Sequence, residues 1–538
     1  MPGVVSCQSQ PSASRRCARI RIAQARGCVS LAAAPPSQVA LPPDQPCHQR
    51  CANCRWQVAR SASASEGASM ADIAVIGGGA AGAAAFGELL ARFRHGTVHW
   101  VVGQQAPGRG VAYATRDDRH LLNVRAASMG VFQEQGDAFI QHATRQLGQV
   151  KGSDFLPRRL FGDFIQAQVG ARIDEARRAG RGFRIHPEAA LEIVRRDAGG
   201  YAVRIGDGRW LEVSDVILAI GALAQRPLRA VSSTALASGA YELDPWQLER
   251  HQQVPRRVVV IGTGLTAVDT LLSASLRWPH AELVAVSRHG MWPCTHSALP
   301  LASHPQQEAL NRALMACHGV LPMLRLVRAA VDTAPDSDWR SIIDGMRPIN
   351  AGLWQRLSHA GRRQFLRHLR WLWEVSRHRM APASGQAIQQ LQEEGRLQVH
   401  AARVLAVDGA APLQVTLRER ATQLVSTLQA DLVVQATGLD TAVAYGAHDL
   451  LSQCLRAGLA VADPLQLGVL AQPDGQLLDA CGAPLPGLYA IGSLLRGNLW
   501  ECTAMPEIRA AAHQLALRLG GRDEAATSRG HAGDGPGG

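Results

Sequence analysis

Three glycines that follow a short apolar run have the spacing of a phosphate-binding turn. Residues 73–76 read IAVI, and Gly77, Gly79 and Gly82 then form the pattern G-x-G-x-x-G at the start of a helix-forming run, Ala80 to Arg94. The first glycine allows a tight turn, the second leaves room for a pyrophosphate, and the third lets the helix pack closely on the strand. Unpaired N–H groups at the helix N-terminus attract the anion. The pattern therefore predicts a dinucleotide site.

A second turn of the same kind occurs 185 residues later. Residues 258–261 read VVVI and lead into Gly262, Gly264 and Ala267, where alanine takes the third glycine position and adds only one methyl group. Two such turns in one chain are much more specific than one. They predict one unit for FAD and one for NAD(P)H, so that a hydride can pass between the two cofactors.

The second strand of each unit should end beside a ribose, where an acidic residue usually binds the hydroxyl groups. Neither unit has that acid. The run 97–102 is followed by Gly103, Gln104 and Gln105, and the amide oxygen of either glutamine could accept the same hydrogen bond. The run 283–286 is followed by Arg288, which could pair with the 2′-phosphate of NADP or could be an ordinary surface arginine. The arginine favours NADPH over NADH.

Three further segments could contact the flavin. Arg109 lies in GRGVAY and could face the pyrophosphate, and Asn123 lies in LLNVRAASMG and could face the ring. Both segments could equally be ordinary turns. Near the C-terminus, an apolar strand at 488–491 ends at Gly492 and Ser493. Flavin folds often have Gly-Asp there, so Ser493 keeps a hydrogen-bonding group but brings no charge.

These patterns predict an α/β protein with two doubly wound, Rossmann-like dinucleotide-binding domains, a discontinuous FAD-binding domain and a helical insertion. In the insertion, apolar residues recur at three- or four-residue steps from Leu353 to His378, which predicts an amphipathic helix capping an active site. The expected parts are an N-terminal extension at 1–69, the first FAD part at 70–230, the NAD(P) domain at 231–300, the insertion at 301–400, the returning FAD part at 401–520 and a loose tail at 521–538.

The N-terminal extension lacks hydrophobic periodicity, and we expect it to be disordered or untranslated, with the working protein starting at Met70. Its Cys47, Cys51 and Cys54 have an iron–sulfur spacing, but no strand or core surrounds them, which argues against a cluster. The absence of a C-x-x-C redox pair among the other cysteines favours a reducing cytoplasm and argues against a disulfide reductase.

Charge and hydropathy exclude other classes of protein. The chain has 56 Lys and Arg against 44 Asp and Glu, a net charge of +12, but residues 1–65 carry +7 of it. The rest mixes both signs, which does not indicate nucleic-acid binding. No run of about 20 apolar residues predicts a membrane span. No metal site stands out, and the oligomeric state is open.

Together, GGGAAG (77–82), GRGVAY (108–113), LLNVRAASM (121–129), GTGLTAVD (262–269), RHRMAP (377–382) and GNLWECTAMPEIR (497–509) resemble a bacterial family of FAD/NAD(P)-binding oxidoreductases. Its architecture is similar to that of flavin-containing and N-hydroxylating monooxygenases. The resemblance implies an FAD-dependent monooxygenase that consumes NAD(P)H and oxygen and acts on a small molecule.

The most specific expectation from the resemblance is urate hydroxylation to 5-hydroxyisourate in purine catabolism. Asn123, Arg347, Asn350 and Arg379 are the donors that could then contact urate. The alternatives are another flavin-dependent oxidoreductase, such as an N-hydroxylating monooxygenase or a reductase, and a flavin-binding regulator without turnover.

Overall fold

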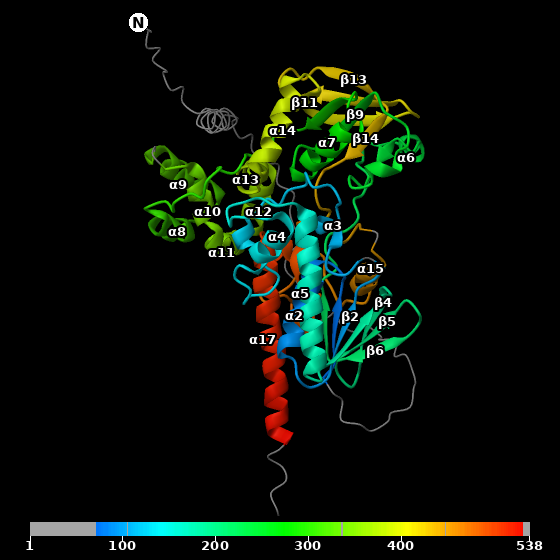
Figure 1. Ribbon diagram of the computed structural model, residues 1–538, viewed down its shortest axis with the longest axis vertical. Helices are drawn as coiled ribbons and strands as arrows, with labels where there is room; N and C mark the ends of the chain where they lie inside the picture. Colours follow the sequence, from blue (N-terminus) through cyan, green and yellow to red (C-terminus); the bar gives the residue numbers. More distant parts are fainter. Residues whose placement is uncertain (1–70, 105, 335–336, 447, 531–538) are drawn as a thin grey trace, which may run out of the picture. The chain divides into compact units, whose positions relative to one another are not determined.

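The computed structural model describes residues 71–104, 106–334, 337–446 and 448–530. The expectations for residues 1–69, including the Cys47, Cys51 and Cys54 pattern, lie outside the described residues, as does the end of the tail from residue 531. Two large sheets contain most of the strands, and helices surround them (Figure 1).

The first large sheet is assembled from two distant parts of the sequence. Its strand order is β15-β16-β7-β1-β2-β3, and all neighbours are parallel except β15 and β16. The strands are β1 (Ile73–Ile76), β2 (Thr97–Val101), β3 (Gly182–His186), β7 (Asp215–Leu218), β15 (Gln476–Leu478) and β16 (Pro484–Ala490). A separate antiparallel sheet lies between β3 and β7 in the sequence: β4 (Ala190–Arg195), β5 (Tyr201–Ile205) and β6 (Trp210–Val213).

The second large sheet repeats this plan. Its order is β13-β12-β11-β10-β9-β14-β8, with β9 between β10 and β14 just as β1 lies between β2 and β7. The strands are β8 (Tyr241–Glu242), β9 (Arg257–Ile261), β10 (Glu282–Ser287), β11 (Leu397–Asp408), β12 (Leu413–Glu419), β13 (Val425–Ala430) and β14 (Leu432–Gln435). The strand order reverses at β1 and at β9, and doubly wound sheets bind ligands at the carboxyl ends of such strands. The predicted α/β fold is confirmed.

Helices connect these strands and form the insertion. They are α2 (Ala80–Arg92), α3 (Gly110–Tyr113), α4 (Ala138–Leu147), α5 (Arg158–Arg178), α6 (Ser233–Ala237), α7 (Leu265–Arg277), α8 (Gln307–Ala316), α9 (Val320–Thr333), α10 (Trp339–Gly345), α11 (Asn350–Arg356), α12 (His359–His368), α13 (Arg370–Arg377), α14 (Pro382–Glu393), α15 (Asp449–Arg456), α16 (Arg496–Leu499) and α17 (Met505–Gly530). Short 3₁₀ turns are η3 (Ala126–Ser128), η4 (Leu248–Arg250), η5 (Arg347–Ile349) and η6 (Gly492–Leu495).

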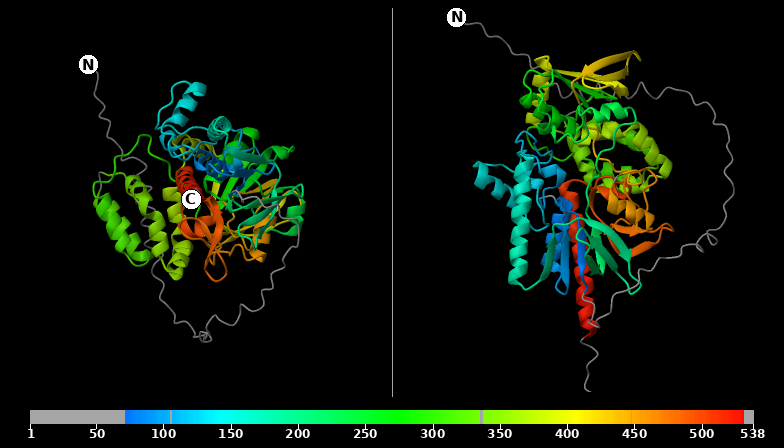
Figure 2. Two further views of the ribbon diagram at one scale, coloured as in Figure 1. Left: turned by 90° about the horizontal axis from the view of Figure 1, so that it is seen from below. Right: turned by 90° about the vertical axis from the view of Figure 1, so that its right-hand side faces the viewer.

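Strand β1 is buried on both faces, as the uninterrupted apolar run predicts. Ile73 and Val75 contribute to the core beneath α2, α5 and α17, whereas Ala74 and Ile76 face the core that includes the β4-β5-β6 sheet and α15. Successive strand residues point to opposite faces, so a strand covered on both sides must be apolar throughout. Helix α17 runs beside α2 (Figures 1 and 2).

The prediction of one amphipathic helix from Leu353 to His378 is wrong. The structure has three helices there, α11, α12 and α13, interrupted at Leu357 and Leu369. The Ser358 hydroxyl accepts a hydrogen bond from the Gly361 amide and caps α12. Apolar residues of all three helices, among them Trp354, Phe365 and Trp373, still pack in one cluster, so the spacing alone did not reveal the turns.

Two expected boundaries also differ from the structure. Strands β11 to β14 pair within the second sheet, so the chain returns to the first sheet after Gln435 and not at residue 401. The tail expected to be loose from residue 521 continues helix α17 to Gly530. Glycine-rich composition suggested a loop, but the preceding residues already form a helix whose apolar side chains pack in the core around α2.

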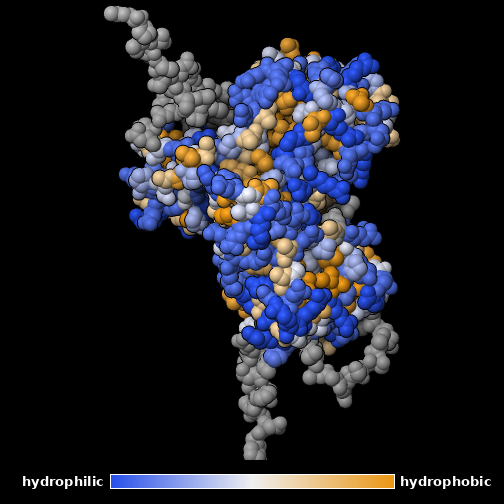
Figure 3. All heavy atoms as spheres, in the orientation of Figure 1, coloured by the Kyte–Doolittle hydropathy of each residue, from blue (hydrophilic) through white to orange (hydrophobic). Residues whose placement is uncertain are grey.

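The surface is mixed in polarity. In the face shown in Figure 3, hydrophilic residues predominate and apolar residues are scattered among them. Among the residues that the structure describes, no helix is both long and apolar enough to cross a membrane.

Gly82 and Gly170 offer a test of the close contact between α2 and the turn. A Cβ atom on Gly82 would lie 1.9 Å from the Gly77 carbonyl oxygen, whereas one on Gly170 in α5 would meet nothing within 4 Å. We expect Gly82→Ala to destabilise the fold by about 3 kcal/mol, because the helix must move away from the strand. Gly170→Ala should stabilise it by roughly 0.5–1 kcal/mol, since alanine favours the helix. Denaturant unfolding measures both, and equal stability of the two variants would contradict the packing role of Gly82.

Candidate functional site

The first glycine turn is built by close backbone contacts. Gly77 has φ +127°, and a Cβ atom there would lie 2.3 Å from the Ala219 carbonyl oxygen beyond β7. Its amide donates to the Val101 carbonyl at 2.9 Å, and its own carbonyl accepts from the Trp100 indole at 2.9 Å. Gly77 is therefore hydrogen-bonded to β2 and lies against the residue that follows β7, so no side chain fits at this position.

Gly79 borders open space at the N-terminus of α2. A Cβ atom on Gly79 would have only the Gly110 Cα atom nearby, at 3.7 Å, and no side chain caps the helix. The first N–H groups of α2 are therefore available to a ligand, and the missing Cβ leaves room for it. This geometry fits the pyrophosphate of a dinucleotide.

Gly492 and Ser493 lie at the carboxyl end of β16, next to the same helix. Gly492 has φ +82°, and a Cβ atom there would lie 3.6 Å from Cβ of Ala81 in α2. The Ser493 side chain is buried, and its Oγ has no hydrogen-bond partner among the described residues. A buried hydroxyl without a partner beside an anion-binding helix start fits a bound cofactor. The residues of the first unit thus fit FAD.

The structure gives the contacts of Arg109 and of the Asn123 backbone, and the exposure of Gln104. The Arg109 guanidinium pairs with Asp163 on α5, and its Nη2 atom donates to the Gln166 side chain on the same helix at 2.9 Å. Gln104 is exposed near the carboxyl end of β2. The Asn123 carbonyl oxygen accepts a hydrogen bond from Nε2 of His296 at 3.0 Å. The roles of these three residues toward FAD stay predictions.

The second glycine turn repeats the first. Gly262 has φ +132°, and a Cβ atom on it would lie 2.2 Å from the Ala436 carbonyl oxygen beyond β14. Gly264 begins α7 without a side-chain cap, and a Cβ atom there would meet nothing within 4 Å. Ala267 lies in the first turn of α7, and its side chain is fully buried in the core that this helix covers. The second unit fits another dinucleotide.

Two guanidinium groups lie near the end of β10. Arg288 is exposed directly after the strand, as the sequence predicts. Nη1 of Arg420, which follows β12, lies 3.0 Å from Nδ1 of His289, and the His289 ring stacks on Trp371 at 4.4 Å. Arg420 was not predicted, because its hairpin reaches this strand end only through the pairing of β11 with β12. Together the arginines could bind a 2′-phosphate.

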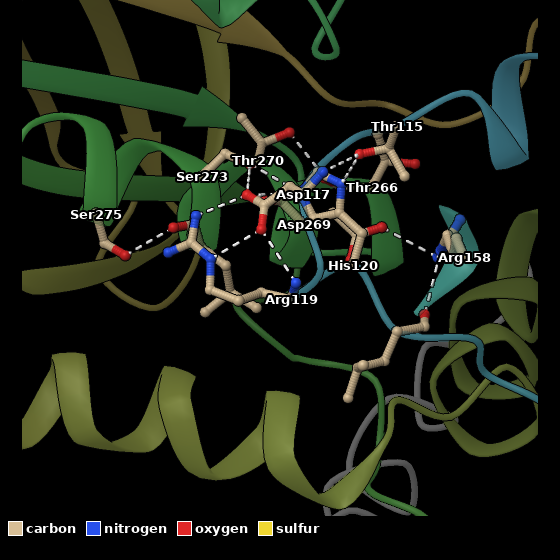
Figure 4. Close-up of polar contacts among 12 residues, drawn as sticks. Thr115, Asp117, Arg119, His120, Arg158, Thr266, Asp269, Thr270, Ser273 and Ser275 are labelled. Atoms are coloured by element: carbon tan, nitrogen blue, oxygen red, sulfur yellow. Dashed lines mark hydrogen bonds and ion pairs between the residues drawn. The ribbon is translucent and has the colours of Figure 1, made fainter. Parts of the chain in front are cut away.

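A buried polar network joins α7 to the segment that follows α3 (Figure 4). Nε2 of His120 lies 2.8 Å from the Ser273 hydroxyl and 3.1 Å from the Asp269 carbonyl oxygen, and the same hydroxyl donates to Asp117. Arg158 of α5 forms an ion pair with the Asp269 carboxylate at 3.0 Å. The two dinucleotide units are therefore connected by hydrogen bonds and charge as well as by the chain.

Burial and charge act differently on the acids of this network. Burial raises the pKa of Asp269, and Arg158 opposes that shift. Burial would also raise the pKa of Asp117, but hydrogen bonds from Arg119 and Ser273 hold it well below its usual range. Asp117 is therefore a carboxylate that these donors stabilise. None of these contacts was predicted, because their side chains come from separate elements.

Three of the four donors proposed for urate, Arg347, Asn350 and Arg379, are bound to carboxylates. Arg347 binds Glu507 through two hydrogen bonds of 2.7 and 2.9 Å, and Asn350 donates to Glu501 at 2.9 Å. Arg379 donates to Asp344. These pairs connect the insertion internally and to the segment before and at the start of α17. Among the described residues, no cluster of His, Cys, Asp and Glu could hold a metal ion.

Comparisons with known proteins agree with this geometry. Residues 74–223, which contain the first glycine turn, match a family model described as FAD-NAD(P)-binding. A search of curated proteins found no match. Solved structures share the fold: ornithine N-hydroxylase from Kutzneria sp. 744 has 15% identity and a TM-score of 0.54, and 84% of this chain covers 99% of that one.

Two other solved structures are similar to the same extent. L-lysine 6-monooxygenase from Pseudomonas syringae has 19% identity and a TM-score of 0.55, with 84% of this chain covering 99% of that one. Cadaverine monooxygenase from Erwinia amylovora has 14% identity and a TM-score of 0.55, with 84% covering 94%. The expected α/β fold with two dinucleotide-binding units is confirmed. Urate as substrate gains no support from the comparisons.

Gly79 and Gly264, the glycines that border open space at the starts of α2 and α7, provide a matched pair of variants. Gly79→Val should abolish the flavin absorbance of the purified protein, because the side chain would occupy the space of the pyrophosphate. Gly264→Val should keep the flavin but lose its reduction by NAD(P)H. Visible spectra before and after anaerobic addition of NADPH distinguish the variants. Full flavin content in Gly79→Val, or unchanged reduction in Gly264→Val, would contradict the assignment of the two units.

The buried network should make stability depend on pH. Burial, the largest cause, lowers the pKa of His120 below its ordinary value of 6.5. The unfolded chain therefore binds this proton more readily, and the free energy of unfolding falls as the pH drops below that value. We expect His120→Gln to make this decrease shallower. His359→Gln, at an exposed position of α12, is the control. Denaturant titrations from about pH 7 to about pH 5 measure the slopes, and parallel slopes would contradict the role of His120.

Proposed function

We propose that this protein is an FAD-dependent, NAD(P)H-consuming monooxygenase that hydroxylates the nitrogen of a primary amine. The observation that carries the proposal is the length of the structural match: 84% of this chain covers nearly all of three enzymes named for ornithine, lysine and cadaverine. The matched part is long enough to include both glycine turns and the helical insertion. Amine hydroxylation thus takes precedence over urate hydroxylation.

The two glycine turns support the use of two dinucleotides. Gly79 and Gly264 each begin a helix that has open space in front of it and no side-chain cap. FAD would lie at α2 near Ser493, and NAD(P)H at α7 near Arg288 and Arg420. The two guanidinium groups at β10 favour NADPH, because its 2′-phosphate is the additional anion.

A cysteine that contacts Gly492 in the first unit argues against a disulfide reductase. Cys502 is buried and donates a hydrogen bond to the Gly492 carbonyl oxygen at 3.1 Å. Burial raises the pKa of its thiol to about 12, so it stays protonated near neutral pH. The described cysteines are all free thiols. Thiol exchange requires the thiolate, which this environment disfavours.

The cofactors would supply the redox chemistry: NAD(P)H and oxygen together convert the amine to a hydroxylamine, with NAD(P)⁺ and water as the other products. The chain's own residues bind and orient. His296 packs against Phe155 with ring centroids 4.8 Å apart and donates to the Asn123 carbonyl. Burial and nearby arginines lower its pKa to about 3, so its ring is neutral and fixes this loop without adding charge.

Substrate-dependent product formation tests the proposal. We expect the protein, purified with FAD, to form a hydroxylamine from L-ornithine, L-lysine or cadaverine at the expense of NADPH, measured by mass spectrometry of the product. Gly264→Val should form none, because reduction of the flavin depends on the second unit. Urate is the comparison substrate, followed by its ultraviolet absorbance. Consumption of urate without hydroxylamine from any amine would replace the proposal by urate hydroxylation, and NADPH oxidation that no substrate raises would leave a flavoprotein without this activity.

A further inference from the structure

The carboxyl end of β10 presents two arginines without acidic partners. Arg288 follows this strand and Arg420 follows β12, and both residues are exposed. Among the residues that the structure describes, neither guanidinium forms an ion pair, and Glu419, the acid next to Arg420, is bound to a histidine of β11 at 2.8 Å. At the amino end of the same strand, by contrast, Arg257 pairs with Glu282 at 2.7 Å. The carboxyl end thus has two positive charges that no acid compensates.

The turn that contains Arg288 is fixed to the second glycine turn. Thr263 is the middle residue of that glycine turn, and its Oγ1 atom lies 2.9 Å from the Ser287 hydroxyl and 2.8 Å from the Met291 carbonyl oxygen. The Gly290 amide donates to the same Ser287 hydroxyl at 3.0 Å. A dinucleotide whose pyrophosphate lies at the glycine turn has its adenosine ribose at the end of the second strand. The arginines therefore lie where that ribose is expected.

His289 holds Arg420 beside this turn. Nη1 of Arg420 lies 3.0 Å from Nδ1 of His289 and donates to the Arg288 carbonyl oxygen at 3.4 Å. Because a guanidinium only donates, Nδ1 is the acceptor. Burial and the charges of Arg420 and Arg288 lower the pKa of His289 to about 4, so the ring is neutral near neutral pH and Nδ1 keeps its lone pair. Nε and Nη2 of Arg420, which lie on one common edge, have no partner among the described residues and are available to a ligand.

The helical insertion supports His289. Trp371, in the first turn of α13, stacks on the His289 ring with centroids 4.4 Å apart and an angle of 15° between the ring planes. The Trp371 indole donates to the His368 carbonyl oxygen at 2.9 Å. Further along α13, the Val375 carbonyl oxygen accepts a hydrogen bond from the Cys294 amide at 2.8 Å. Helix α13 is thus bound at two places to the segment that follows β10.

We propose that His289, supported by Trp371, positions the Arg420 guanidinium beside Arg288 so that both arginines bind the 2′-phosphate of NADPH. A phosphate monoester has more than one negative charge and several acceptor oxygens, which two guanidinium groups match. His289 and Trp371 are positioning residues, because their contacts are with Arg420 and with each other. This inference rests on the proposed function, in which the second unit binds NAD(P)H. It adds that the insertion takes part in selecting NADPH.

Binding of adenosine nucleotides to the FAD-loaded protein tests the site without turnover. Isothermal titration compares adenosine 2′,5′-bisphosphate with adenosine 3′,5′-bisphosphate, which has the same charge, and with adenosine 5′-monophosphate. We expect the 2′-phosphate to tighten binding at least about tenfold relative to both other nucleotides, as hydrogen bonds to charged groups do. Arg288→Gln and Arg420→Gln should each remove most of this preference. Equal binding of the three nucleotides by the wild-type protein would overturn the inference.

Two variants of Trp371 test the contribution of the insertion. Trp371→Ala should weaken binding of the 2′,5′-bisphosphate about fivefold, as expected from the loss of one aromatic pair. It should leave the flavin content and the binding of the 5′-monophosphate unchanged, because the glycine turns are intact. Trp371→Phe, which keeps a stacking ring, should bind nearly as the wild type does. Trp210→Ala is the control, since Trp210 is 47% exposed on β6. A full preference in Trp371→Ala would overturn the role of the insertion.

Hydrogen exchange of the wild-type protein gives a test that does not depend on the folding of a variant. Adenosine 2′,5′-bisphosphate should protect the amides of residues 370–377 in α13 as well as those of residues 287–290. The 5′-monophosphate should leave α13 unprotected, because it lacks the group that the arginines bind. Exchange in α13 that the 2′,5′-bisphosphate does not slow would overturn the inference.

The outcomes distinguish this inference from amine hydroxylation. Trp371-dependent preference for the 2′,5′-bisphosphate, without hydroxylamine from any amine, would support the phosphate site and refute amine hydroxylation. Hydroxylamine formation that proceeds equally well with NADH and NADPH, together with equal binding of the three nucleotides, would do the reverse.

Discussion

The arrangement of the molecule depends on how closely a helix can approach the strand before it. Helix α2 begins shortly after β1. A Cβ atom on Gly82 would lie only 1.9 Å from the carbonyl oxygen of Gly77, so only a glycine allows the helix to approach this closely. This contact fixes the direction of the helix, so that its N-terminal amides point to the carboxyl end of the sheet. An anion can then be bound by backbone groups alone.

The second unit repeats the turn without the third glycine. The second unit accepts Ala267 where the first has Gly82, and both begin their helix with a glycine that faces open space. Catalysis by bound cofactors places few demands on the identity of side chains and strict demands on backbone geometry. This explains why the glycines of the chain are easier to interpret than its polar residues.

The polar residues mainly connect elements. Arg109 holds α5, His120 and Asp269 connect the two units, and Glu501 and Glu507 bind the insertion. These charged groups are held by partners from other parts of the chain, because burial of a charge without a partner is costly. Arg379 departs from this pattern, since only one of its three nitrogen atoms has found a partner among the described residues.

The sequence by itself determined the local features: β1 and β9, the glycine turns, the helices that follow them and the two-unit α/β fold. These depend on residues close together in the chain, where period and glycine spacing act directly. The tertiary structure decided which partner each side chain has. Arg109 is an example, because a guanidinium that looks free for a phosphate in the sequence is bound to Asp163 and Gln166, 54 and 57 residues away. The sequence also did not reveal the breaks between α11, α12 and α13, or that β11 to β14 belong to the second sheet. Both depend on packing and strand pairing between distant segments, which the spacing of neighbouring residues does not encode.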